Sequence, residues 1–147
     1  MAIWFREYRL EELDKIGKGN MVSHLGIEFV EIGEDLLKAR MPVDGRTRQP
    51  FGILHGGASV VLAETIGSYA ANMVADYPNK IFVGQEINAN HIRPVRSGSV
   101  TGTARPLHIG STSQVWEIRI CDDQERLVCI SRITMALARS INQKGKG

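Results

Sequence analysis

The chain has 147 residues, of which 43% are hydrophobic and 23% charged, and its formal net charge is +2 at pH 7. This length and composition are typical of one folded domain and exclude a disordered or fibrous chain. The small, dispersed positive charge argues against a nucleic-acid-binding protein, and no run of about eighteen apolar residues predicts a membrane span.

Compartment and domain limits follow from the two ends of the chain. Residues 1–6 lack the apolar core of a signal peptide, so we expect a cytoplasmic protein. Cys121 and Cys129 are then expected to be reduced and buried. One domain is expected over residues 1–139, followed by a frayed polar tail over residues 140–147.

The first third of the chain predicts a short helix and a hairpin. Leu10, Leu13 and Ile16 repeat at helical spacing before two glycines. Residues 25–32 and 36–43 suit two antiparallel strands, with Leu37, Ala39 and Met41 on one face. Residues 44–54 contain glycine and proline and predict a long loop, which is a feature typical of functional sites.

One long helix and a series of strands follow this loop. Residues 58–74 contain no proline and carry a broad apolar stripe that includes Leu62, Ile66 and Tyr69. The rest of the chain predicts strands at residues 81–87, 91–95, 100–107, 114–121 and 127–137. Since most connections are too short for crossover helices, we predict an α+β fold with an antiparallel sheet of five to six strands wrapped around one helix.

The second side of the long helix carries a carboxylate among small residues. Its members are Ala63, Glu64, Gly67, Ser68 and Ala71. Such small residues allow another backbone to approach closely. A glutamate on a core helix would be costly to bury without a partner or a purpose, and Ser68, four residues on, shares its face.

The start of the helix offers hydrogen-bond donors. Gly56 and Gly57 fall where the first amides of the helix have no intrahelical acceptor, so they could donate to a polarised carbonyl oxygen. Gln49 and His55 add neutral hydrogen-bonding groups from the preceding loop. Taken singly, each feature has a structural explanation, because a Gly-Gly pair is often only a turn and a histidine often only a satisfied hydrogen-bonder.

Together these groups suit the hydrolysis of a thioester, whose thiolate departs without a strong general acid. Glu64 could attack the carbonyl to form an anhydride, or it could deprotonate the attacking water, and the sequence leaves both routes open. A hydratase acting on an enoyl thioester and a noncatalytic acyl-coenzyme A binding protein are the alternatives of other classes.

The run His55-Gly56-Gly57-Ala58-Ser59, its spacing to Glu64 and Ser68, the preceding Gln49-Pro50-Phe51-Gly52 and the later segment 86–91 resemble the hotdog-fold acyl-coenzyme A thioesterases. The resemblance covers about residues 3–137 and is greatest to the branch that contains the 4-hydroxybenzoyl-CoA thioesterases and the 1,4-dihydroxy-2-naphthoyl-CoA hydrolases of menaquinone synthesis. It implies hydrolysis of an aromatic acyl-CoA, with 1,4-dihydroxy-2-naphthoyl-CoA as the leading substrate. A broad-specificity acyl-CoA or acyl-carrier-protein proofreading thioesterase is the alternative.

The resemblance also implies roles for residues. Glu64 would be the catalytic carboxylate and the Gly56 N–H the oxyanion donor, while Gln49 and His55 would orient the thioester and Ser68 would lie near the attacking water. The implied substrate-binding surface comprises Gly84, His91, Ile92, Arg93, Pro94, His108, Ile109, Gly110, Ser111, Thr112 and Ser113. The site would lie across a homodimer interface, two dimers would form a homotetramer, and neither cofactor nor metal is needed.

Three structural expectations remain. Trp4 and Trp116 are expected to anchor the core or an interface. Arg132, within an apolar strand, is expected to pair with Glu86 or Glu117.

Overall fold

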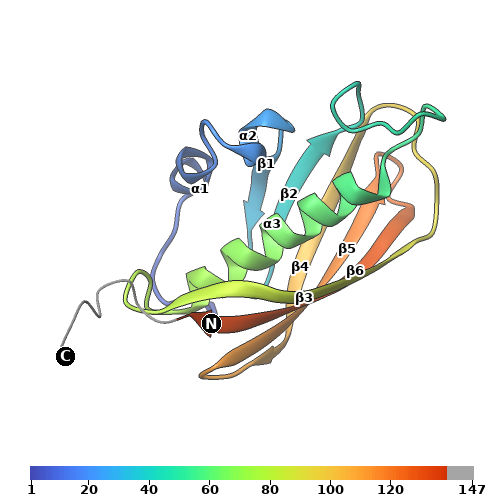
Figure 1. The fold of residues 1–147 in the computed structure, drawn as a ribbon. Helices are drawn as coiled ribbons and strands as arrows, with labels where there is room; N and C mark the ends of the chain where they lie inside the picture. Colours follow the sequence, from blue (N-terminus) through green and yellow to red (C-terminus); the bar gives the residue numbers. More distant parts are fainter. Residues whose placement is uncertain (139–147) are drawn as a thin grey trace, which may run out of the picture.

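The computed structural model describes residues 1–138, and the predicted tail over residues 140–147 lies outside them. Six antiparallel strands form one sheet in the order β1-β2-β4-β5-β6-β3. The strands are β1 (Glu28–Ile32), β2 (Leu37–Pro42), β3 (Ile81–His91), β4 (Ser99–Ile109), β5 (Ser113–Asp122) and β6 (Leu127–Ala138). The long helix α3 (Gly56–Val74) crosses one face of the sheet, while α1 (Leu10–Ile16) and α2 (Met21–His24) lie near β1 (Figure 1). This confirms the predicted α+β hotdog architecture.

The face of α3 that meets the sheet carries small as well as large apolar residues. Its buried members include Leu62, Ala63, Ile66, Gly67, Ala70 and Ala71. A Cβ added at Gly67 would lie 2.7 Å from Cγ2 of Ile133, so the helix approaches β6 too closely for a side chain there. The predicted small-residue side of the helix is therefore mostly core, and Glu64 is the one exposed member of that set.

The largest departure from the predicted strands is β3. The sequence predicts separate strands at residues 81–87 and 91–95, whereas the structure has one strand from Ile81 to His91. This strand pairs with β6 along its whole length. Continuous backbone pairing outweighs the low strand preference of Asn88 and Asn90, which is why the predicted break does not occur.

The segment before β1 also differs from the prediction. The strand expected over residues 25–32 begins only at Glu28, because the short helix α2 precedes it. The Asn20 side chain caps this helix by accepting a hydrogen bond from the Val22 N–H at 3.0 Å. Gly26 then turns the chain with a φ of 72°.

The two tryptophans form part of the core, as expected. The rings of Trp4 and Trp116 stack with centroids 6.4 Å apart, and Trp116 is fully buried. Both cysteines are free, but only Cys129 is fully buried, and burial raises the pKa of its thiol. Within residues 1–138, no helix combines the length and the apolar character needed to cross a bilayer.

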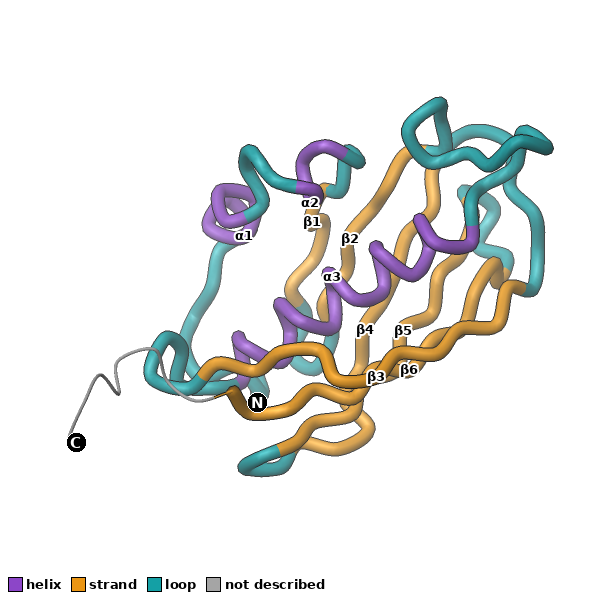
Figure 2. Tube along the Cα trace, in the orientation of Figure 1, coloured by secondary structure: helices purple, strands orange, loops and turns teal. Residues whose placement is uncertain are grey.

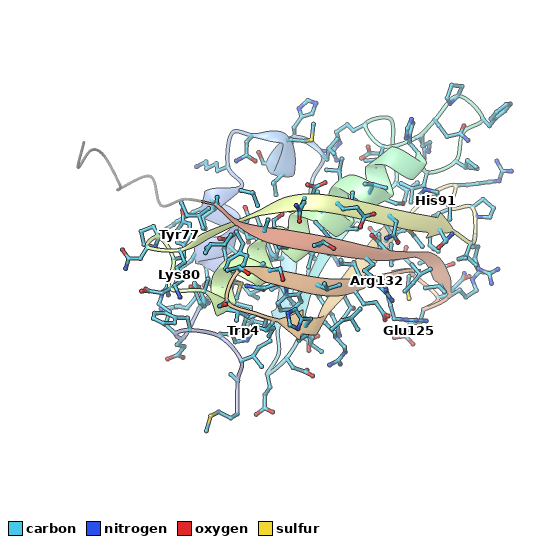
Figure 3. The ribbon with its side chains drawn as sticks, turned by 60° about the horizontal axis from the view of Figure 1, so that its bottom comes forward. Trp4, Tyr77, Lys80, His91, Glu125 and Arg132 are labelled. Atoms are coloured by element: carbon cyan, nitrogen blue, oxygen red, sulfur yellow. The ribbon has the colours of Figure 1, made fainter. Side chains whose placement is uncertain are left out.

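The predicted partner of Arg132 is wrong. Arg132 is exposed on the outer face of the sheet (Figure 3), where it makes no ion pair with any residue between 1 and 138. Glu117, directly across the strand pair, instead lies 4.0 Å from Arg119. An exposed guanidinium is hydrated by solvent and needs no carboxylate partner.

Candidate active site

The loop over residues 44–54 is held in one conformation by its own side chains. The Thr47 hydroxyl, which is buried, donates to the Pro42 carbonyl at 2.8 Å. Asp44 accepts hydrogen bonds from the Arg46 guanidinium at 2.8 and 3.2 Å, and these bonds lower the pKa of Asp44 to about 2. The loop is thus an ordered structural element, and its functional role stays a prediction.

The same loop is tied to the segment that follows β3. Arg48 Nε donates to the Arg96 carbonyl at 3.0 Å, and the Leu54 N–H donates to the Val95 carbonyl at 2.7 Å. Between these two walls lies a cleft of about 450 Å³. Its lining includes Gln49, Ile53, Leu54 and Gly56 on one side and His91, Ile92, Arg93 and Pro94 on the other. The structure therefore brings together six residues that the sequence predicts for the site.

The first turn of α3 leaves one amide free. The first four N–H groups of a helix need acceptors from outside it. His55, the N-cap, satisfies three of them: its Nδ1 accepts from Gly57 at 2.8 Å, and its carbonyl accepts from Ala58 at 2.9 Å and from Ser59 at 3.2 Å. No residue between 1 and 138 accepts a hydrogen bond from the Gly56 N–H. Gly57, which the sequence also predicts as a donor to substrate, is therefore engaged and unable to serve.

These bonds also determine which groups His55 and Gln49 can offer. Because Nδ1 of His55 accepts a hydrogen bond, the neutral ring carries its proton on Nε2, which becomes a donor. The Gln49 side-chain oxygen accepts from the Phe51 N–H, so its amide nitrogen is left as the free donor of the side chain. The Nε2–H of His55, the side-chain N–H groups of Gln49 and the backbone N–H of Gly56 are donors of the kind that stabilise a developing negative charge on a carbonyl oxygen.

Gly56 is also close-packed on its second side. A Cβ added there would lie 2.8 Å from Nε2 of His91, so the imidazole rests against the glycine backbone. Contact of this kind requires glycine or a shift of the histidine side chain. It joins the end of β3 to the start of α3.

Glu64 lies farther along the helix, beside β3. A Cβ added at Gly84 would lie 2.6 Å from Oε1 of Glu64, so the carboxylate sits over the glycine of the strand. Glu64 is exposed in the protomer, and no residue between 1 and 138 forms an ion pair or a hydrogen bond with it. The expectation of a buried carboxylate is therefore wrong for a single chain, although the absence of a partner leaves the group available for chemistry.

Ser68 is directed to the same strand pair as Glu64. Its hydroxyl lies 3.9 Å from the sulfur of Met135, and Met135 pairs with Gly84 across β6 and β3. Glu64 and Ser68 thus share a helix face, as their spacing predicts, and both meet the Gly84–Met135 step of the sheet.

The predicted site residues fall into separate regions of one protomer. Gly56 and Glu64 are about two turns apart, or roughly 12 Å along the helix axis. Figure 2 shows that the loop leading into α3 and the loop following β3 both lie at the start of α3. Figure 3 shows His91 and Tyr77 at opposite ends of β3. The turn over residues 108–113 lies at the Ile81 end of the sheet, because Ser113 pairs with Ala136 near the end of β6.

Several cleft residues were not predicted from the sequence. Ser59 and Val128 line the cleft, and Arg48 holds its two walls together. Val128 comes from the start of β6 and accepts a hydrogen bond from the Ile92 N–H at 2.8 Å. No local pattern marks such a contact, because it depends on the register of strands distant in sequence. Among residues 1–138, no three His, Cys, Asp or Glu side chains form a group that could hold a metal ion.

Comparison with known proteins shows which family this chain resembles. A model of the thioesterase superfamily matches residues 51–129, which include α3, β3 and every lining residue of the cleft except Gln49. A thioesterase from Haemophilus influenzae superposes with a TM-score of 0.93 at 47% identity, covering 98% of this chain and 100% of that one.

Two relatives have more specific names. The chain is 56% identical over 135 residues to the 1,4-dihydroxy-2-naphthoyl-CoA hydrolase of Escherichia coli (strain K12), covering 92% of this chain and 98% of that protein. It is 51% identical over 135 residues to the proofreading thioesterase EntH of Cronobacter turicensis, again covering 92% and 98%. The similarity therefore extends well beyond the motif around the start of α3.

Proposed function

Because the chain belongs to the thioesterase superfamily and is a thioester hydrolase, we propose that it cleaves an aromatic acyl-CoA, with 1,4-dihydroxy-2-naphthoyl-CoA as the leading substrate. The observation that carries the proposed mechanism is a pair of groups on α3 that have no partner within the described part of the chain: the N–H of Gly56 and the carboxylate of Glu64. The substrate is supported by the name of the Escherichia coli relative, which matches over nearly its whole length.

In the proposed reaction the thioester carbonyl oxygen accepts a hydrogen bond from the Gly56 N–H, with Gln49 and His55 orienting the group. The positive end of the helix dipole favours the negative charge that develops on this oxygen. Glu64 either attacks the carbonyl carbon or removes a proton from the attacking water, and Ser68 lies near that water. In both routes the C–S bond breaks and coenzyme A leaves as the thiolate.

We propose that each site is shared by two protomers. A carbonyl cannot reach both Gly56 and Glu64 of one chain across roughly 12 Å. β3 lies at the edge of the sheet, where its unpaired backbone groups can form hydrogen bonds with a second copy. If Gly84 lies opposite the partner's His91, the twofold axis passes between Ile87 and Asn88, and each Glu64 meets the partner's Gly56.

This pairing also unites the predicted substrate-binding segments. His91, Ile92, Arg93 and Pro94 lie at one end of β3, and the turn from His108 to Ser113 lies at the other. Antiparallel pairing would place the partner's turn on the same side as this protomer's cleft. We assign both segments to the coenzyme A, and a homotetramer formed by two such dimers is part of the same proposal.

A proofreading role is the second candidate. It is supported by the 51% identity to relatives named as proofreading thioesterases. The chemistry would be the same, but the thioester would be carried on the phosphopantetheine arm of a carrier protein. Comparing kcat/KM for one aryl group on coenzyme A and on a carrier protein would separate the two roles, since the preferred carrier should give the higher value.

The central test is thiol release from a panel of acyl-CoAs by wild type and Glu64→Gln. We expect kcat to fall at least about a hundredfold with KM nearly unchanged, because the amide can bind substrate but neither attacks nor accepts a proton. Asp76→Asn, which removes a carboxylate beyond the end of α3, serves as the matched control and should leave kcat unchanged. Equal turnover by wild type and Glu64→Gln would remove Glu64 from the mechanism.

A further inference from the structure

A second cavity lies on the other side of Glu64 from the cleft. It has a volume of about 210 Å³ and is formed between the N-terminal segment and the second half of α3. Tyr8, Leu13 and Ile16 contribute one wall, and Ser68, Met73 and Tyr77 contribute another. A cavity of about 150 Å³ with an apolar lining is large enough to hold a benzene ring, so this one can hold an aryl group.

The cavity lies next to the proposed reaction centre. Ser68 lines it and lies one helical turn beyond Glu64. Both side chains meet the step of the sheet at which Gly84 pairs with Met135. A substrate whose carbonyl lies beside Glu64 can therefore extend its acyl group past Ser68 into this cavity.

The N-terminal wall is anchored on both sides. Trp4 Nε1 donates to the Gly33 carbonyl at 2.7 Å, and the Phe5 N–H donates to the Met73 carbonyl at 2.9 Å. On the far side of the wall, Asp14 accepts a hydrogen bond from the Phe29 N–H at 3.3 Å. These bonds connect the segment to β1, to α3 and to the turn before β2, so it forms a fixed boundary.

The chemistry of the lining selects an uncharged ligand. Leu13 is buried, and burial raises the pKa of the Tyr8 phenol, so that ring is neutral at pH 7. At the rim, Ile16 and Tyr77 are 59% and 52% exposed, which is unusual for large apolar side chains beside an apolar cavity. Exposed apolar rims of this kind mark sites that bury an apolar ligand.

We propose that this cavity receives the acyl group of the thioester and that α1, chiefly through Ile16, limits the size of the aryl group accepted. The inference rests on the proposed function, because it takes the position of the carbonyl from Glu64. It assigns selectivity to a helix that lies outside both the cleft and the family match over residues 51–129.

The test compares acetyl-CoA, benzoyl-CoA and 2-naphthoyl-CoA as substrates of the full-length enzyme. In Ile16→Trp, the larger side chain narrows the cavity, so kcat/KM should fall about tenfold for 2-naphthoyl-CoA, less for benzoyl-CoA, and by less than about twofold for acetyl-CoA. Ile16→Ala should act in the opposite direction and raise the ratio of 2-naphthoyl to benzoyl turnover about threefold.

Met21→Trp is the matched control, because Met21 is 61% exposed on α2 and lies outside the cavity. Met21→Trp should leave kcat/KM for each of the three acyl-CoAs within about twofold of the wild-type value. An equal effect of Ile16→Trp on all three substrates, or no effect on any, would overturn this inference while leaving the mechanism at Glu64 intact. If the wild type hydrolyses none of the acyl-CoAs tested, the proposed function itself is overturned.

Discussion

The two ends of the proposed machinery on α3 are built in different ways. At the start of the helix, His55 satisfies three amides by bonds to residues within four positions of itself and leaves the Gly56 N–H free. Two turns later, Glu64 has no hydrogen-bond or ion-pair partner among residues 1–138 and lies over Gly84 of β3. The first region is organised by local sequence, whereas the second depends on how β3 packs.

This difference shows what a single protomer can and cannot do. At the start of α3 one protomer already provides a cleft, which Gln49 and Gly56 line and to which we assign the oxyanion. Glu64 is exposed and lies beside β3, an edge strand of the sheet, and in the proposed dimer a second copy covers this edge and excludes water from the carboxylate.

The largest effect is expected from removing the N–H of Gly56 while keeping the helix. Gly56→Pro should be tolerated, since proline suits the first helical position and His55 already has the extended φ of −67° and ψ of 129° that precede a proline. We expect kcat to fall about 10²- to 10³-fold.

Gly56→Ala is the control for this change. It introduces the same Cβ against His91 but keeps the N–H, so any loss caused by crowding appears in both variants. The role of the amide is measured by the ratio of the two kcat values. Equal kcat values for Gly56→Pro and Gly56→Ala would show that this N–H does not stabilise the reaction.

Mixing the two inactive chains tests whether the ends belong to different protomers. In a heterodimer of Glu64→Gln and Gly56→Pro, one of the two shared sites combines the intact Glu64 of one chain with the intact Gly56 of the other. Random exchange at equal amounts should therefore restore about a quarter of wild-type activity, a rise of at least about 25-fold over either variant alone. Exchange verified by mass spectrometry without recovered activity would place both groups of one site in the same chain.

The sequence predicts the fold well where the signal is local or periodic. The apolar alternation of Leu37, Ala39 and Met41 and the proline-free run of α3 identify their elements because burial imposes those periods. β3 was divided wrongly, since Asn88 and Asn90 weaken the strand signal that pairing with β6 then overrides. The short helix α2 was missed although its Asn20 cap could have revealed it.

The same distinction between local and long-range signals applies to the residues of the site. Local motifs predicted Gln49, His55 and Gly56, and the structure places all three at one cleft or its helix cap. Val128 was not predictable, since it reaches the cleft only through the sheet. The exposure of Glu64 was also missed, because a one-dimensional pattern cannot show which side of a helix lies over the edge strand of its own sheet.

The smallest effect is expected at Gly84, whose backbone lies against the carboxylate of Glu64. In Gly84→Ala the new Cβ would lie 2.6 Å from Oε1 of Glu64, so the carboxylate must swing away from the strand. We expect kcat to fall about tenfold with little change in the melting temperature, because displacing a reacting group by about 1 Å is enough to slow chemistry by this order. Val83→Ala, whose side chain points to the opposite face of β3, is the control and should retain wild-type kcat.

A double variant shows whether Gly84 has any role apart from the acid. If its only function is to leave room for the carboxylate, adding Gly84→Ala to Glu64→Gln should cost nothing further, since the group it displaces has already lost its chemistry. A second tenfold loss in the double variant would mean that Gly84 contacts the substrate directly. In that case β3, and not α3 alone, would form part of the site around Glu64.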